Sequence, residues 1–106
     1  MTLVTQLSGM GILLVGNPSV LYDVPSEGYL RVIEETVKIA GGWKKIEAWH
    51  VNTKCDSFTA SRGLSTLVNT LGALHGIDVY SLQRNEAPKK VLLPIHPSYS
   101  GEPNIG

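Results

Sequence analysis

The feature that most constrains the fold of this chain is the order of its apolar segments. Three short segments rich in β-branched and aliphatic residues come first, at 2–8, 9–15 and 20–24. Two stretches with helical spacing then alternate with further strand-like stretches. This β-β-β-α-β-α-β order predicts an α/β domain with a mixed sheet. An antiparallel meander is expected to lead into two right-handed crossovers.

The first helix is expected to begin at Ser26, a good N-cap residue, and to end at Gly41-Gly42. Its apolar face is marked by Leu30, Ile33 and Val37, which recur at helical spacing. A strand is predicted over 43–51, because polar and apolar residues alternate there.

The second helix is expected from about Ser57 to His75, with Gly76 ending it. It carries two stripes. The large one is Leu64, Leu67, Val68, Leu71 and Leu74, and the small one is Ala60, Gly63, Thr66, Thr70 and Ala73. Only one stripe is needed to cover the sheet. The small stripe would let another helix approach closely, either a partner's helix or the first helix of the same chain.

The end of the chain is expected to hold a strand over 77–82, a polar link at 83–90 and a short strand over 91–95. Pro94 would confine that last strand to a sheet edge. Residues 1–84 are therefore predicted to form the domain, and 85–106 a remnant strand followed by an irregular tail.

The charge of the chain narrows its function. Nine basic residues balance nine acidic ones, which argues against direct nucleic-acid binding by bulk charge. Charged residues make up only 17%, which suggests that a partner covers part of the surface. The chain has no apolar run long enough for a bilayer and no basic segment leading into an apolar one, so a cytoplasmic protein is expected.

The stretch richest in reactive and polar side chains is 54–62, Lys-Cys-Asp-Ser-Phe-Thr-Ala-Ser-Arg, at the start of the second helix. Backbone N–H groups at a helix start can bind a phosphate. The alternative is that Asp56, Ser57 and Thr59 only cap the helix. The loop has no glycine, so a cradle of the Walker type is not expected.

The segment Asp56-Ser57-Phe58-Thr59-Ala60-Ser61-Arg62 resembles the Gly-Ser-Phe-Thr-Gly-x-Arg signature of the TsaB (YeaZ-type) family. The resemblance extends over most of residues 2–82, the N-terminal domain of that family. It implies half of an actin-like (ASKHA, ribonuclease H-like) fold. It also implies a place in the bacterial machinery that makes the threonylcarbamoyl-adenosine modification of tRNA.

The chain departs from that family at the end of its first strand. Gln6-Leu7-Ser8 stands where the family has Asp-Thr-Ser, whose acid serves phosphate and metal in active actin-like ATPases. Asp56 and Ala60 also stand where the family usually has glycine. The resemblance therefore implies a shortened, catalytically inert member that needs no cofactor.

The resemblance implies that the two helices form a dimer surface, toward a second copy or toward the catalytic subunit TsaD. A residual nucleotide-binding domain or weak ATPase using Ser57, Thr59 and Arg62 is one alternative. A homodimer unrelated to tRNA is another. The expected interface residues are Leu30, Ile33, Val37, Ala60, Gly63, Leu64 and Leu67.

Other candidate groups carry weaker signals. His50, His75 and His96 are spread over the chain without a metal-ligand spacing, so no metal site is expected. Cys55 stands beside Lys54 at a helix start, which can activate a thiol, but the sequence places no partner base near it. Trp43 and Trp49 are expected in or near the core, with Trp49 at an interface edge as an alternative.

Overall fold

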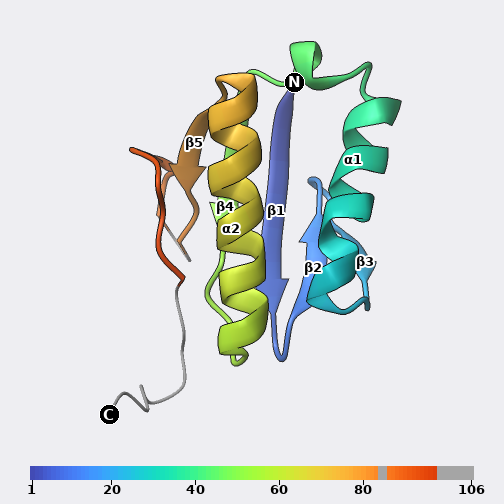
Figure 1. Cartoon of the computed structure of the whole chain (residues 1–106), viewed down its shortest axis with the longest axis vertical. Helices are drawn as coiled ribbons and strands as arrows, with labels where there is room; N and C mark the ends of the chain where they lie inside the picture. Colours follow the sequence, from blue (N-terminus) through green and yellow to red (C-terminus); the bar gives the residue numbers. More distant parts are fainter. Residues whose placement is uncertain (84–85, 98–106) are drawn as a thin grey trace.

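A computed structural model describes residues 1–83 and 86–97 of the chain. It contains a sheet, two α-helices and two short 3-10 helices (Figure 1). The strands are β1 (Thr2–Ser8), β2 (Ile12–Val15), β3 (Val20–Tyr22), β4 (Ala48–Asn52), β5 (Asp78–Ser81) and β6 (Lys89–Val91). The helices are η1 (Ser26–Gly28), α1 (Tyr29–Ile39), η2 (Trp43–Lys45) and α2 (Phe58–His75).

The six strands form one mixed sheet in the order β3-β2-β1-β4-β5-β6. The first three strands pair antiparallel as a meander, and β1, β4 and β5 run parallel to one another. β6 returns antiparallel along β5. The predicted α/β class, mixed sheet and element order are therefore confirmed. β6 pairs with β5 in this sheet, so the sheet extends past the expected end of the domain at residue 84.

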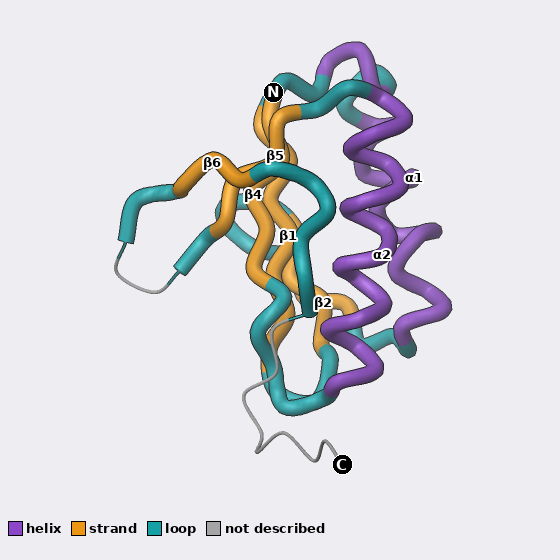
Figure 2. Tube along the Cα trace, turned by 60° about the vertical axis from the view of Figure 1, so that its left-hand side comes forward, coloured by secondary structure: helices purple, strands orange, loops and turns teal. Residues whose placement is uncertain are grey.

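Both α-helices cover the same face of the sheet (Figure 2). Side chains alternate along each strand, so every second residue of β1, β2 and β4 faces the helices. That face and the inner sides of the helices form the core. Its largest fully buried side chains are Trp49, Tyr29, Leu3, Leu13, Ile33, Leu64, Val37, Val68 and Val79.

The centre of the core contains one polar pair. Trp49 on β4 and Thr5 on β1 are both fully buried, and the indole Nε1–H of Trp49 donates to Thr5 Oγ1 at 2.9 Å. Buried polar groups need such partners. Trp49 therefore lies in the core, and the alternative that placed it at an interface edge is wrong.

Several element boundaries differ from the prediction for local reasons. The segment 43–45 turns as a 3-10 helix after the glycine pair, so β4 begins only at Ala48. Ser26 lies inside η1, and α1 has no side-chain cap. The last strand is 89–91 instead of 91–95, because the chain leaves the sheet before the cis peptide bond at Pro94.

The ends of α2 match the prediction. The Ser57 side chain accepts a hydrogen bond from the Ala60 N–H at 3.2 Å, and Gly76 adopts the left-handed conformation that terminates the helix. The expected irregular tail is described only to residue 97, and its remainder, 98–106, lies outside the described residues.

Candidate functional site

The outer face of α2 is almost free of charge. Among its 18 residues, Arg62 is the one residue with a full charge. The side turned away from the sheet exposes Thr66, Thr70 and Ala73, and Leu74 on its flank is 72% exposed. A solvent-facing helix normally carries charged residues opposite its core face. Apart from Arg62, the outer face of α2 therefore lacks the charged residues that are usual on a solvent-facing helix.

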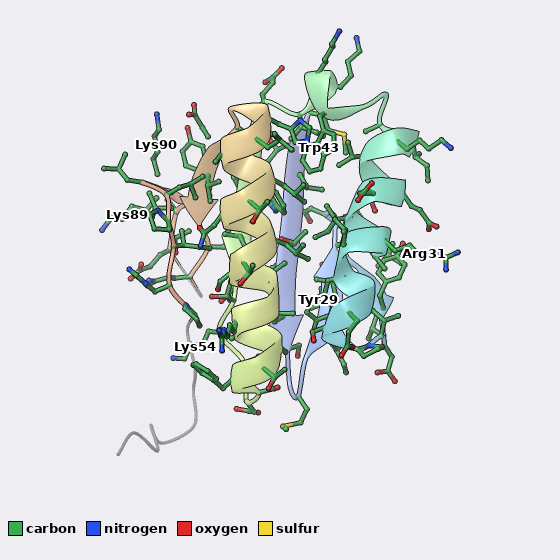
Figure 3. All side chains as sticks on the ribbon, in the orientation of Figure 1. Tyr29, Arg31, Trp43, Lys54, Lys89 and Lys90 are labelled. Carbon is green, nitrogen blue, oxygen red and sulfur yellow. The ribbon has the colours of Figure 1, made fainter. Side chains whose placement is uncertain are left out.

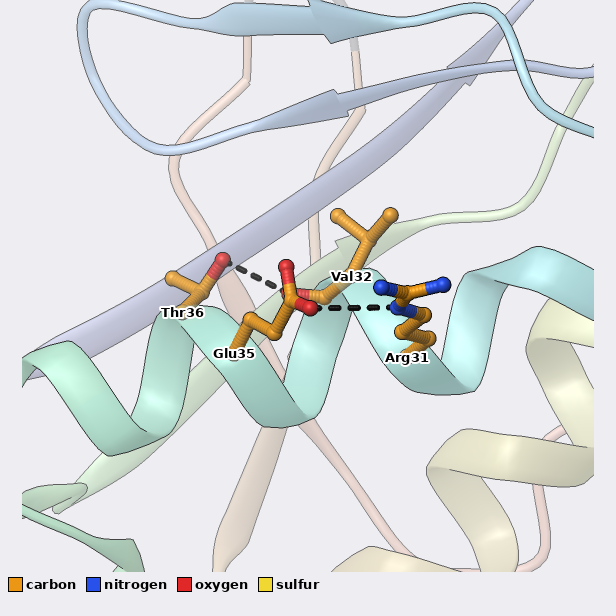
Figure 4. Close-up of polar contacts among 4 residues, drawn as sticks. All are labelled: Arg31, Val32, Glu35 and Thr36. Atoms are coloured by element: carbon orange, nitrogen blue, oxygen red, sulfur yellow. Dashed lines mark hydrogen bonds and ion pairs between the residues drawn. The ribbon is translucent and has the colours of Figure 1, made fainter.

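The second helix contrasts with the first. α1 exposes Arg31, Glu34, Glu35 and Lys38 within 11 residues. Figure 3 shows Arg31 pointing outward from the molecule. Its Nε–H donates to Glu35 Oε1, one helical turn further on, at 3.1 Å (Figure 4). Both side chains are mostly exposed, so this ion pair contributes little to stability.

A groove of about 840 Å³ follows α1 from Glu27 to Gly41 and ends at Trp43. Leu30 is its exposed apolar residue, at 38%. Both ends of the groove adjoin α2. Ser26, next to Glu27, lies against Gly63, and Trp43 stacks on His75 with ring centroids 4.4 Å apart. We call this groove and the exposed residues Thr66, Thr70, Ala73 and Leu74 the helix face.

Trp43 links the helix face to the core. Its ring lies 5.8 Å from that of Trp49 and is parallel to the His75 imidazole within 6°. Figure 3 shows Trp43 beside the C-terminal end of α2. The prediction that Trp43 and Trp49 lie in or near the core is confirmed, since Trp49 is fully buried and Trp43 packs against the core. The stacking on His75 joins η2 to α2.

The seven expected interface residues divide into two groups. Ile33, Val37, Ala60 and Leu64 are buried in the core of this chain, so their side chains do not lie on the outside as expected. The reason is that the sides of α1 and α2 that carry these residues pack against the sheet. Leu30 is exposed, and Gly63 and Leu67 are half-buried. These three remain at or beside the helix face.

Gly63 brings two elements of the same chain together. A Cβ atom built on Gly63 would lie 3.0 Å from the Ser26 Cβ, closer than ordinary contact. The small stripe of α2 therefore packs on the chain's own first helical segment at this point. Further along, Thr66, Thr70 and Ala73 are exposed.

The family-like segment 56–62 surrounds the start of α2. Asp56, Phe58, Thr59 and Arg62 are exposed, whereas the Ser57 hydroxyl caps the helix. The Asp56 N–H donates to the Gly9 carbonyl at 2.8 Å, which fixes the segment against the β1–β2 turn. The capping role expected for Ser57 is confirmed.

The β1–β2 turn is packed tightly under the two helices. Gly11 has φ +116°, and a Cβ atom there would lie 2.7 Å from the Ala60 Cβ and 2.9 Å from the Tyr29 hydroxyl oxygen. The Tyr29 O–H donates to the Gly11 carbonyl in a short, buried hydrogen bond. Burial, with smaller effects from Cys55 and Glu27, raises the pKa of Tyr29 above its ordinary value of 10.0. The phenol therefore stays neutral and keeps donating.

The remaining candidates stay apart in space or are used by the fold. Cys55 is buried, and its Sγ–H donates to the Ser57 carbonyl at 3.2 Å. His50 packs edge-on against Tyr80, and His75 stacks on Trp43. Within the described residues, no three His, Cys, Asp or Glu side chains form a group that could hold a metal ion.

Two features of the helix face were missed by sequence reasoning. The groove beside α1 depends on a 3-10 turn at 43–45, which the alternation of residues had suggested to be a strand. The lack of charge on α2 could have been read directly from its sequence.

Comparison of the chain with models of known families, with curated proteins and with solved structures yields no match. Neither α-helix of the described chain has the length and apolar character needed to cross a membrane.

Proposed function

We propose that this chain is a non-catalytic docking subunit that binds its partner through the helix face. The observation that carries the proposal is the outer surface of α2, which has a single charged residue in 18 and exposes Leu74 beside threonines and an alanine. Following the resemblance to the TsaB family, the proposed partner is a TsaD-like catalytic subunit of tRNA threonylcarbamoyladenosine modification.

The physical argument for docking is the gain on covering apolar surface. Burying a leucine side chain contributes about 1.5–3 kcal/mol relative to leaving it in water. Leu30 and Leu74 are both exposed, and Thr66 and Thr70, on the same helix as Leu74, bring no charge to desolvate. A helix of a partner could pack along the exposed side of α2 without removing any ion from water except near Arg62. The groove beside α1 is lined by charged residues as well, so a partner that enters it has to complement those charges.

The fold supports the same family assignment at the level of topology. The element order β-β-β-α-β-α-β, with β1, β4 and β5 parallel, is the order expected for half of an actin-like domain. We therefore propose the actin-like (ribonuclease H-like) class as the finer description of the α/β fold. The proposal assigns no nucleotide hydrolysis, because Gln6-Leu7-Ser8 ends β1 without an acidic residue.

The test uses charge to block docking without unfolding the chain. Thr66 and Thr70 are exposed on α2, and glutamate is a better helix former than threonine. The double variant Thr66→Glu/Thr70→Glu should therefore fold as well as the wild type. Size exclusion with light scattering, on the chain alone and mixed with the TsaD-like protein of the same organism, measures assembly. We expect a wild-type complex that the double variant does not form.

The control is Ser19→Glu, which adds one negative charge in the exposed β2–β3 turn, away from the helices, and is compared with Thr66→Glu and Thr70→Glu made singly as well as together. It should leave the complex intact. A complex that survives the double variant would contradict docking through the helix face. A homodimer that ignores the TsaD-like protein and is lost in the double variant would keep the docking face and overturn the proposed partner.

A further inference from the structure

A second concave site lies at the end of the sheet, apart from the helix face. β4 and β5 run parallel and end side by side, with Val51 opposite Ser81 in register. Beyond their carboxyl ends is a pocket of about 810 Å³. Ligands of open α/β sheets bind in this position, outside the carboxyl ends of parallel strands, and the volume lies in the range of small-molecule sites.

The outer wall of the pocket is held in place by a specific contact. The chain after β6 runs back along α2 (Figure 2). The pocket is lined by Val91 at the end of β6 and, from the chain that follows, by Leu92, Pro94, Ile95 and His96. Asn69 on α2 fixes this segment with two hydrogen bonds to Ile95. Its Nδ2–H donates to the Ile95 carbonyl at 2.9 Å, and its Oδ1 accepts from the Ile95 N–H at 2.6 Å. The wall is thus anchored by an amide that pairs in both directions.

The floor of the pocket is formed by the two strand ends. The Asn52 Oδ1 accepts the Lys54 N–H at 3.0 Å, which sets the turn that follows β4. At the end of β5 the Leu82 N–H donates to the Val51 carbonyl at 2.8 Å. Asn52, Lys54, Ser81 and Gln83 therefore all come from backbone that is fixed by the sheet or by a turn.

The lining has a definite chemical character. Lys54 and His96 bring basic nitrogen to it, and the described lining residues include no Asp or Glu. Figure 3 shows Lys54 at the foot of the molecule, on the side where the chain after β6 descends. The opposite wall is apolar, with Val91, Leu92 and Ile95.

We propose that this pocket binds a small organic anion, with an apolar or aromatic body against residues 91–95 and a carboxylate or phosphate group at Lys54. An unpaired carboxylate on the protein would oppose such a ligand, and none lines the described pocket. Lysine binds carboxylate and phosphate groups alike as a point charge, so the experiment below compares the two head groups.

The test is a titration of the isotopically labelled chain, followed by amide chemical shifts in nuclear magnetic resonance. Three probes share a phenyl ring and differ in the head group: benzoate, phenyl phosphate and the neutral benzyl alcohol. We expect one or both anions to shift the amides of 51–54, 81–83 and 91–96, and benzyl alcohol to bind at least tenfold more weakly. Comparing the two anions distinguishes a carboxylate site from a phosphate site.

Variants connect the binding to the geometry. Lys54→Gln should weaken binding of the anion about tenfold, the order expected for one charge-assisted contact. The matched control Lys38→Gln, on α1, should leave it unchanged. Asn69→Ala should weaken binding of the anion and speed hydrogen exchange of the Ile95 amide, because the wall loses its anchor. Equal binding of benzyl alcohol, shifts confined to other parts of the chain, or no shifts at 10 mM probe (roughly the weak limit of small-ligand binding) would overturn the proposal.

Discussion

The tight turn between β1 and β2 allows a sharp test of how this core is packed. In Gly11→Ala the new Cβ would lie 2.7 Å from the Ala60 Cβ, about 1 Å inside the ordinary separation of carbon atoms. Overpacking of this kind costs about 1–3 kcal/mol. The positive φ of +116° adds backbone strain of about 1–2 kcal/mol for any residue with a side chain. We expect Gly11→Ala to lower the free energy of unfolding by about 3 kcal/mol.

Gly9→Ala, in the same turn, is the matched control. Gly9 also has a positive φ, +55°, but a Cβ atom there would meet nothing within 4 Å. Only the backbone strain applies, so we expect a loss of about 1 kcal/mol. Urea denaturation followed by circular dichroism measures both variants. The roughly 2 kcal/mol difference corresponds to a Tm difference of about 8 °C or more in a domain of this size.

A second variant separates the clash from the strain. Ala60→Gly removes the atom that the new Cβ meets, at its own cost of up to about 1 kcal/mol in a helix. The double variant Gly11→Ala/Ala60→Gly should lose about 1–2 kcal/mol less unfolding free energy than the sum of the losses in the two single variants. Equal losses for Gly9→Ala and Gly11→Ala, or strict additivity in the double variant, would refute the close approach of the turn to α2.

Three further changes test other parts of the core. Tyr29→Phe should cost about 1–3 kcal/mol, because a buried carbonyl loses its donor. Because the pKa of Tyr29 is raised in the folded state, the contribution of its hydroxyl to stability is complete below about pH 10 and is lost as the pH rises further. Urea titrations from about pH 8 to 11 should therefore show a steeper fall of the unfolding free energy for the wild type than for Tyr29→Phe. Thr5→Val leaves the Trp49 indole N–H buried without its partner and should lower the unfolding free energy by about 1–3 kcal/mol, with no loss in an exposed threonine variant such as Thr70→Val. Gly63→Leu should destabilise the monomer itself, because the side chain would displace Ser26; thermal unfolding at low concentration that matches the wild type would contradict this contact.

The order of elements could be predicted from the sequence because it depends on local periodicity. Period-two segments at 2–8 and 78–81 and helical spacing over 58–75 became strands and a helix within a few residues of the predicted ends. Ser57 and Gly76 were also predictable, since each acts through its own backbone neighbourhood. Local alternation was misleading at 43–45, where the chain turns as a 3-10 helix after two glycines with positive φ and Trp43 stacks on His75, far along the chain.

The outer and inner stripes of α2 could not be distinguished from the sequence, and the reason is geometric. The helix carries a stripe of large side chains, mostly leucine, and beside it a stripe of small ones, and either stripe could face the sheet. The structure buries Ser61, Ser65 and Gly72 with Leu64 and Val68, so the buried arc combines both sizes. Small buried residues allow a helix to approach a sheet closely, and the large ones fill the space that remains.

The consequence is that Leu67 and Leu74 lie on the side of α2 toward α1, where Leu67 is half-buried and Leu74 is exposed to solvent. Their positions follow from the buried arc: once Ser61, Ser65 and Gly72 face the sheet, Leu67 and Leu74 must lie on the flank of α2 near Gly63. This arrangement gives a specific expectation for the helix face. Leu74→Ser removes exposed apolar surface and should leave the unfolding free energy of the chain within about 0.5 kcal/mol of the wild type. If the helix face is the docking surface, the same change should weaken the complex about tenfold, as expected when one leucine no longer becomes buried. Unchanged affinity in Leu74→Ser would place the contact elsewhere on the molecule.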